Sequence, residues 1–246
     1  MVNYGPASKY YDLFGSKEDI AFYKDLAIKH GRRALELGVG TGRVAIELAK
    51  AKVNILGIDS SRYMLNIAGT KLMRERAEVR NRLRLKLGDM RKFRLEEHYP
   101  FAYLASSTFE HCITEKDQRD CIRSVRDALK IGGVLAFDIS QPHADLESSW
   151  WIDRKETASE EIVRTIFSRR NLKTNVISVN LFFDVYRNGK MKERYYEYGE
   201  AKISPKEEVK KILEEAGLTI IKLYGNFDKS VYSPKSQRII FVCSKS

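Results

Sequence analysis

Between residues 19 and 140, short apolar runs of strand length alternate with longer runs whose apolar side chains recur at helical spacing. The strand-like runs are residues 33–40, 53–59, 83–89, 101–107 and 134–140, and the helical runs are residues 19–30, 43–51, 61–79 and 116–130. Glycines are expected to end two of these helices, at Gly31 and at Gly132-Gly133. Strands separated by helices form βαβ units with right-handed crossovers, so the sequence predicts an α/β fold around a parallel sheet.

The pattern changes to a period of two residues between about residue 160 and residue 203. One strand face would carry the apolar side chains Ile177, Val179, Leu181, Phe183 and Val185. Asn188-Gly189 follows and suits the central positions of a type I′ hairpin turn. We therefore expect an antiparallel insertion of two to four strands. After it, Ser204, Pro205 and Glu207 predict the start of a helix that ends at Gly217, and two more strands follow.

The composition limits the setting in which the chain works. It has 246 residues, of which 43% are hydrophobic and 31% charged, which is enough apolar surface for a buried core. No run of about 18 apolar residues could span a membrane, and the N-terminal residues lack the apolar segment of a secretion signal. Cys112, Cys121 and Cys243 have no C-x-x-C spacing, so we expect a reducing, cytoplasmic location. Abundant Lys, Glu and Arg beside few Gln are typical of proteins from hot environments.

Positive charge is concentrated in one part of the sequence. The net charge is +11, and the run from Lys71 to Arg94 holds ten Lys or Arg residues against three acidic ones. Such a basic stripe can hold phosphates or steer an anionic partner, but it also suits a solvated helix face. Because the run lacks interleaved aromatic residues that would stack on bases, a nucleic-acid partner is left open and is not favoured.

The strongest functional motif is a glycine-rich turn between the first predicted strand and its helix. It contains, in order, Glu36, Gly38, Gly40 and Gly42. Glycines let the backbone approach a ligand closely, and the helix start offers unsatisfied N–H groups. The spacing G-x-G-x-G differs from the dinucleotide fingerprint G-x-G-x-x-G, which makes NAD the weaker alternative.

Two acidic residues stand at the ends of the next two predicted strands. Asp59 ends the second strand, where a carboxylate can accept hydrogen bonds from both ribose hydroxyls. Asp89-Met90 ends the third, where a carboxylate and a backbone N–H can bind adenine. Because the carboxyl ends of parallel strands meet at one edge of a sheet, we expect the turn and both acids to converge on a nucleoside.

These motifs resemble those of class I S-adenosylmethionine-dependent methyltransferases. The family's first motif is similar to ALELGVGTGRVAIELA, its second to LGIDSSRYMLNIA, its adenine-contact segment to GDMRKF and the entry to its fifth strand to LKIGGVLAFDI. The N-terminal run ASKYYDLF resembles the lid segment of small-molecule N-methyltransferases. The insertion resembles that of the sugar-amine and glycine N-methyltransferases within the family.

The resemblance implies a domain organisation. Residues 1–140 and 204–246 would form a Rossmann-like methyltransferase domain, with a lid helix within residues 1–30. Its seven-stranded sheet would be mostly parallel with a reversed last strand. Residues 141–203 would form an antiparallel β insertion. From the residues themselves, its aromatic side chains, such as Phe182, Tyr196 and Trp150, would cap the substrate, pair two subunits into a homodimer or form a local core beneath the hairpin.

The resemblance also implies S-adenosylmethionine as the cofactor and a role for each matching residue. The methionine part would lie near Glu36, Gly38, Gly40, Gly42 and Ser106, the ribose near Asp59, Ser60 and Met64, and the adenine near Asp89 and Met90, with Tyr11 reaching over from the lid. Methyl transfer from a sulfonium is an in-line displacement, in which alignment supplies much of the rate; whether a base also takes up a proton is left open. The candidate catalytic residues are His111, Glu110 and Tyr11.

Several acceptor classes do not fit the sequence. Ser106-Ser107-Thr108-Phe109 is not the N-P-P-Y type, no Pro-Cys dipeptide is present, and no acidic cluster after the fourth strand suggests a magnesium site. We therefore expect no metal and favour methyl transfer to a small molecule, with an amine as the first acceptor to consider. The alternatives are an RNA or protein methyltransferase that uses the basic stripe, and a non-catalytic S-adenosylmethionine-binding regulator.

Overall fold

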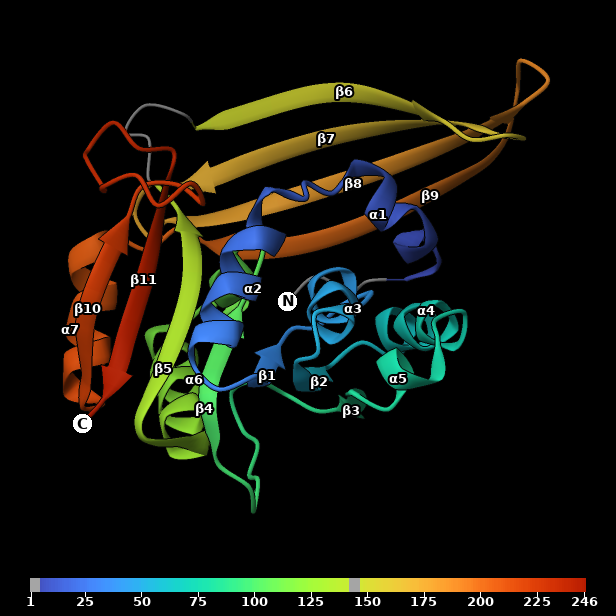
Figure 1. Cartoon of the computed structure of the whole chain (residues 1–246). Coiled ribbons are helices and arrows are strands. Elements are labelled where there is room, and N and C mark those ends of the chain that lie inside the picture. Colours follow the sequence, from blue (N-terminus) through green and yellow to red (C-terminus); the bar gives the residue numbers. More distant parts are fainter. Residues whose placement is uncertain (1–4, 142–146) are drawn as a thin grey trace.

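A seven-stranded sheet forms the centre of the computed structural model, which describes residues 5–141 and 147–246 (Figure 1). Its strand order is β10-β11-β5-β4-β1-β2-β3. The strands are β1 (Arg33–Leu37), β2 (Asn54–Asp59), β3 (Leu83–Leu87), β4 (Tyr99–Leu104), β5 (Leu129–Ser140), β10 (Leu218–Tyr224) and β11 (Arg238–Lys245). β11 runs antiparallel to both of its neighbours, and the other pairs are parallel. The prediction of a mostly parallel seven-stranded sheet with a reversed last strand is confirmed.

Helices cover both faces of this sheet. They are η1 (Pro6–Tyr10), α1 (Tyr11–Phe14), α2 (Glu18–Lys29), α3 (Arg43–Lys50), α4 (Arg62–Met73), α5 (Ala77–Arg80), η2 (Thr108–His111), α6 (Glu115–Ala128) and α7 (Lys206–Glu215). The buried side chains of α2 and α3 pack on one face, and those of α6 and α7 pack on the other. None of the described helices is long and apolar enough to cross a membrane.

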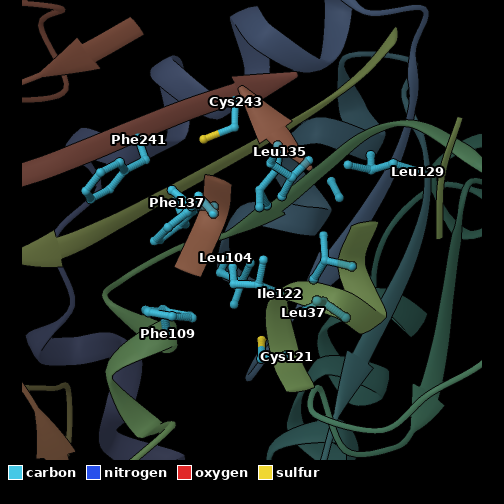
Figure 2. Packing of buried hydrophobic residues seen from close by; sticks show 14 of the residues in the cluster. Leu37, Leu104, Phe109, Cys121, Ile122, Leu129, Leu135, Phe137, Phe241 and Cys243 are labelled. Carbon is cyan, nitrogen blue, oxygen red and sulfur yellow. The ribbon is translucent and has the colours of Figure 1, made fainter. Parts of the chain in front are cut away.

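The core beneath α6 and α7 is built from large side chains of neighbouring strands (Figure 2). Phe137 of β5 lies between Phe109 of η2 and Phe241 of β11, with ring centroids 5.0 Å and 5.2 Å apart. Cys121 and Cys243 are buried in the same cluster as free thiols. Burying such aromatic side chains is the main source of stability in a domain of this kind. It also holds η2, which follows β4, against the end of β5.

A second sheet of four antiparallel strands arches over the carboxyl-end edge of the first (Figure 1). Its strands are β6 (Ser148–Glu156), β7 (Glu161–Asn171), β8 (Val176–Arg187) and β9 (Lys190–Lys202). Asn188 and Gly189, with φ of 52° and 71°, form the turn between β8 and β9. A type I′ turn needs positive φ at both central residues, so this prediction is confirmed.

The two faces of the second sheet have different surroundings. Phe183 and Val185 pack on Ala7 and Tyr10 of the N-terminal segment, which we define as residues 5–14. Trp150, on the opposite face, is 70% exposed and is paired across the strands with the half-exposed Phe167. The predicted homodimer through this sheet stays a prediction.

Three local predictions are wrong. The helical run 61–79 is two helices, α4 and α5, rather than one. Gly132-Gly133 does not end a helix, because α6 stops at Ala128 and β5 already begins at Leu129, where it pairs with β4. Ser204 is not the N-cap of α7: Pro205 takes that position without a side-chain cap. The Ser204 hydroxyl instead accepts a hydrogen bond from the Gln118 amide of α6 at 2.7 Å.

Candidate active site

A pocket opens at the carboxyl ends of the central parallel strands. Its wall consists of Tyr11, Gly38, Gly40, Ile58, Asp59, Ser60, Met64, Gly88, Asp89, Met90, Ser106, Thr108 and His111, around about 670 Å³ of space that is partly open to solvent. The chain order changes direction at β1, which has β2 on one side and β4 on the other. In open α/β sheets, ligands bind at this kind of switch point.

The glycine turn after β1 requires its glycines. Gly38, Gly40 and Gly42 all have positive φ, between 55° and 74°, a region that other residues rarely adopt. A Cβ added at Gly38 would lie 2.4 Å from Cγ2 of Thr108, which packs directly against it in the pocket wall. Gly42 does not line the pocket. It starts α3, where a Cβ would press on Ala68 and Ile46 at 3.3 Å, so its small size serves helix packing.

Asp59 joins the glycine turn to the end of β2. Its Oδ2 accepts a hydrogen bond from the Gly40 N–H at 2.8 Å, and its Oδ1 accepts one from the Ser61 N–H at 2.8 Å. Burial raises the pKa of Asp59, and these backbone donors oppose that shift. The Ser60 backbone is a third donor to this carboxylate, which has about four acceptor sites, so Asp59 can hold the turn and still accept a hydrogen bond from a ligand.

Asp89 is held by an arginine that follows it in the sequence. The Arg91 guanidinium donates to both carboxylate oxygens, with Nε–Oδ1 at 2.9 Å and Nη2–Oδ2 at 2.7 Å. Arg91 also reaches Asp117 of α6 at 2.9 Å. Arg91 thereby lowers the pKa of Asp89, which keeps this carboxylate ionised beside the pocket.

The N-terminal segment brings Tyr11 to the pocket and is fixed beside it. The next residue, Asp12, accepts a hydrogen bond from the Thr41 hydroxyl of the glycine turn at 2.6 Å. Its other oxygen pairs with Lys71 of α4 at 2.8 Å. On the far side, the Gly5 N–H donates to Glu197 of β9 at 3.0 Å. The segment therefore bridges the glycine turn and the second sheet.

Behind the glycine turn lies a group of buried charged residues. Glu36 does not line the pocket: it is 2% exposed, and its Oε2 accepts the Tyr103 hydroxyl proton at 2.8 Å. Burial raises the pKa of Glu36 to about 8. Arg43 donates to both carboxylate oxygens of Asp19 at 2.5 Å and to the Ser106 hydroxyl at 2.6 Å. This fork holds α2 and α3 together beside the pocket.

The residues after β4 divide between the pocket and the core. Ser106, Thr108 and His111 line the pocket, whereas Glu110 turns inward and is only 6% exposed. The Glu110 carboxylate accepts the Ser140 N–H at 2.5 Å, and burial raises its pKa to about 7. The Nδ1 atom of His111 lies 3.4 Å from the carbonyl oxygen of Glu200 in β9. Desolvation lowers the pKa of His111.

The structure brings together most of the residues singled out in the sequence. Tyr11, Gly38, Gly40, Asp59, Ser60, Met64, Asp89, Met90, Ser106 and His111 line one pocket, whereas Glu36, Gly42 and Glu110 lie behind it. Sequence reasoning missed Ile58, Gly88 and Thr108. Ile58 and Gly88 directly precede predicted site residues, which is a signal that could have found them. The role of Thr108 depends on its contact with Gly38, which no sequence pattern records.

The basic stripe is less available than its sequence suggests. Lys71 pairs with Asp12, Arg84 with Glu97, and Arg91 with Asp89 and Asp117. These ion pairs reduce the number of cations that could contact phosphates. A nucleic-acid partner stays a prediction without support from this geometry.

The chain is similar to known methyltransferases in sequence and in fold. Residues 34–133 match the family model of a methyltransferase domain. YqeM of Bacillus subtilis (strain 168), named provisionally as a methyltransferase, is 26% identical over an alignment that covers 100% of this chain and 98% of YqeM. A glycine/sarcosine N-methyltransferase of Aphanothece halophytica is 24% identical over 94% of this chain and 82% of its own length.

A solved structure is also similar to this chain. It is the sugar N-methyltransferase KedS8 from Streptoalloteichus sp ATCC 53650, with a TM-score of 0.79 and 18% sequence identity, and the match covers 98% of this chain and 95% of KedS8. Residues 34–133 are therefore similar to a methyltransferase domain, and the chain has the Rossmann-like methyltransferase fold.

Proposed function

We propose that this chain is an S-adenosylmethionine-dependent methyltransferase that methylates an amine nitrogen of a small molecule. The observation that carries the proposal is the pocket itself. A glycine turn and two strand-end carboxylates, Asp59 and Asp89, line one space at the switch point of a methyltransferase fold. That arrangement is suited to a nucleoside joined to an amino-acid chain.

The residues present fit this cofactor. Asp59 would hold the ribose hydroxyls, Asp89 and Met90 the adenine, and Gly38 the methionine chain, because its bare backbone lines the pocket. Ser106 would lie beside the reacting end. When bound, S-adenosylmethionine supplies an activated methyl group on a sulfonium. The chain itself has to align the acceptor and exclude water, and such alignment can account for a large share of the rate.

His111 is suited to hold the proton that an amine acceptor gives up. A carbonyl oxygen only accepts hydrogen bonds, so the contact with Glu200 places the ring proton on Nδ1 and the lone pair on Nε2. Desolvation lowers the pKa of His111, which favours the neutral ring at pH 7. A neutral imidazole that lines the pocket is a competent general base. Tyr11 would orient the acceptor from the lid side.

Two observations favour a small amine over the alternatives. Two of the similar proteins are named as N-methyltransferases, one of glycine and sarcosine and one of a sugar. The residues that line the pocket do not include any from the described part of the second sheet, residues 148–203. No aromatic side chain of these residues lines the pocket, which argues against a regulator whose pocket they close to turnover.

The direct test is calorimetric titration with S-adenosylhomocysteine, followed by a methyl-transfer screen of amines, amino sugars, RNA and protein. Asp59→Ala removes the ribose acceptor and loosens the glycine turn, so we expect it to weaken binding by about 1–3 kcal/mol. Asp184→Asn is the matched control, because Asp184 is a buried carboxylate paired with Arg194 in the second sheet. The proposal fails if the wild-type protein does not bind, or if both variants bind equally well.

A further inference from the structure

The segment from Ser106 to His111 begins with a backbone conformation that is unfavourable for its residues. Ser106 and Ser107 have φ of 57° and 56°, so two successive non-glycine residues lie in the left-handed region. Such a conformation persists only where surrounding contacts hold it, and it is found at functional sites. Here it directs Ser106, Thr108 and His111 into the pocket.

A buried carboxylate of β5 holds the start of this segment. Asp138 is completely buried, and its Oδ2 accepts both the N–H and the hydroxyl of Ser107, each at 3.0 Å. Its Oδ1 accepts the Tyr23 hydroxyl proton of α2 at 2.8 Å, and Arg238 of β11 lies 3.3 Å from Oδ2. Asp138 therefore ties the strained turn to three other elements of the fold.

The same strand holds the other end of the segment. Glu110 accepts the N–H of Ser140, two residues beyond Asp138 on β5, at 2.5 Å. Glu110 is buried and does not line the pocket, so it cannot exchange a proton with a substrate there. Its neighbour His111 does line the pocket, and a shift of Glu110 would move that ring.

We propose that Asp138 and Glu110 are positioning residues that clamp the 106–111 segment to the end of β5, so that Ser106, Thr108 and His111 keep their places around the reacting centre. The inference rests on the proposed function, since it assigns these contacts to methyl transfer. It replaces a catalytic role for Glu110 with a structural contact through its carboxylate oxygen.

Paired substitutions of Glu110 separate the two roles. Glu110→Gln keeps an oxygen that accepts the Ser140 N–H but cannot exchange a proton, whereas Glu110→Ala leaves that N–H without its partner. We expect the alanine variant to bind S-adenosylhomocysteine about fivefold to tenfold more weakly and to lose kcat with the amine found by the screen. The glutamine variant should recover both values and the wild-type pH–rate profile, and Asp184→Asn should change neither.

A second variant keeps the test decisive if Glu110→Ala does not fold. Ser107→Gly removes the hydroxyl bond to Asp138 while relieving the backbone at positive φ, so its melting temperature should not fall. Its affinity for S-adenosylhomocysteine should fall about fivefold. Wild-type affinity in Ser107→Gly, or a glutamine variant as inactive as the alanine variant, overturns the inference. Failure of the wild-type protein to bind S-adenosylhomocysteine would instead refute the proposed function.

Discussion

Carboxylates around the pocket have pKa values shifted in opposite directions. Arg91 lowers the pKa of Asp89, and burial raises the pKa of Asp59. Glu36 is the extreme case, because the hydrogen bond from the Tyr103 hydroxyl does not offset its burial, and its pKa is raised to about 8. A strand-end acid exposed to the pocket is thus kept charged by an arginine, while the acid behind the turn is neutral near pH 7.

This shift in Glu36 predicts how stability depends on pH. The folded state binds the Glu36 proton more tightly than the unfolded chain, so stability is lost as pH rises from about 4.5 to about 8 and is level above that. Glu36→Gln keeps an acceptor for the Tyr103 hydroxyl and removes the titration. We expect the variant to gain stability over the wild type between pH 5 and pH 9, by at most about 4 kcal/mol. Urea unfolding at the two pH values measures this gain, and an equal difference at both would contradict it.

At the scale of elements, the N-terminal segment is fixed on two sides. Tyr10 packs on Phe183 of the second sheet, while Asp12 contacts Thr41 of the glycine turn and Lys71 of α4. Tyr11 between them lines the pocket. A short element with only a few hydrogen bonds to each side can open without global unfolding. Its contacts with the glycine turn are therefore the ones that should set how long a ligand stays.

Asp12→Ala removes both contacts with the pocket side of the segment. We expect S-adenosylhomocysteine to dissociate about fivefold faster, with little change in the association rate, because one hydrogen bond and one partly exposed ion pair are lost. Stopped-flow measurements of binding give the two rate constants separately. Asp25→Ala is the control, since Asp25 is an exposed acid of α2 that pairs with Lys229 and does not line the pocket. An unchanged dissociation rate would show that Asp12 does not retain the ligand.

At the scale of the whole molecule, the parts predicted from sequence are those encoded locally. Asn188-Gly189 specifies its turn by itself, and the strand ends at Asp59 and Asp89 follow from the alternation of strands and helices. Long-range contacts are not encoded in this way. Glu110 bonds to Ser140 and Ser204 to Gln118, across 30 and 86 residues. For that reason the composition of the pocket was predictable, whereas the burial of Glu110 and the start of α7 were not.

The charge of the whole molecule gives a last test of the acceptor class. The net charge is +11, yet Lys71, Arg84 and Arg91 of the basic stripe are engaged in ion pairs, and the pocket itself is lined by two carboxylates. S-adenosylhomocysteine carries no net charge at pH 7, so its affinity should change less than about twofold between about 50 and 200 mM NaCl.

A small amine acceptor should show a similarly weak salt dependence of KM between these two salt concentrations. An RNA acceptor would release counterions and lose about a thousandfold or more in affinity over this range if it made six or more phosphate contacts. Measuring KM for the acceptor found by the screen at both salt concentrations therefore decides between the two classes, and a steep loss would favour the basic stripe over the pocket as the main contact with the acceptor.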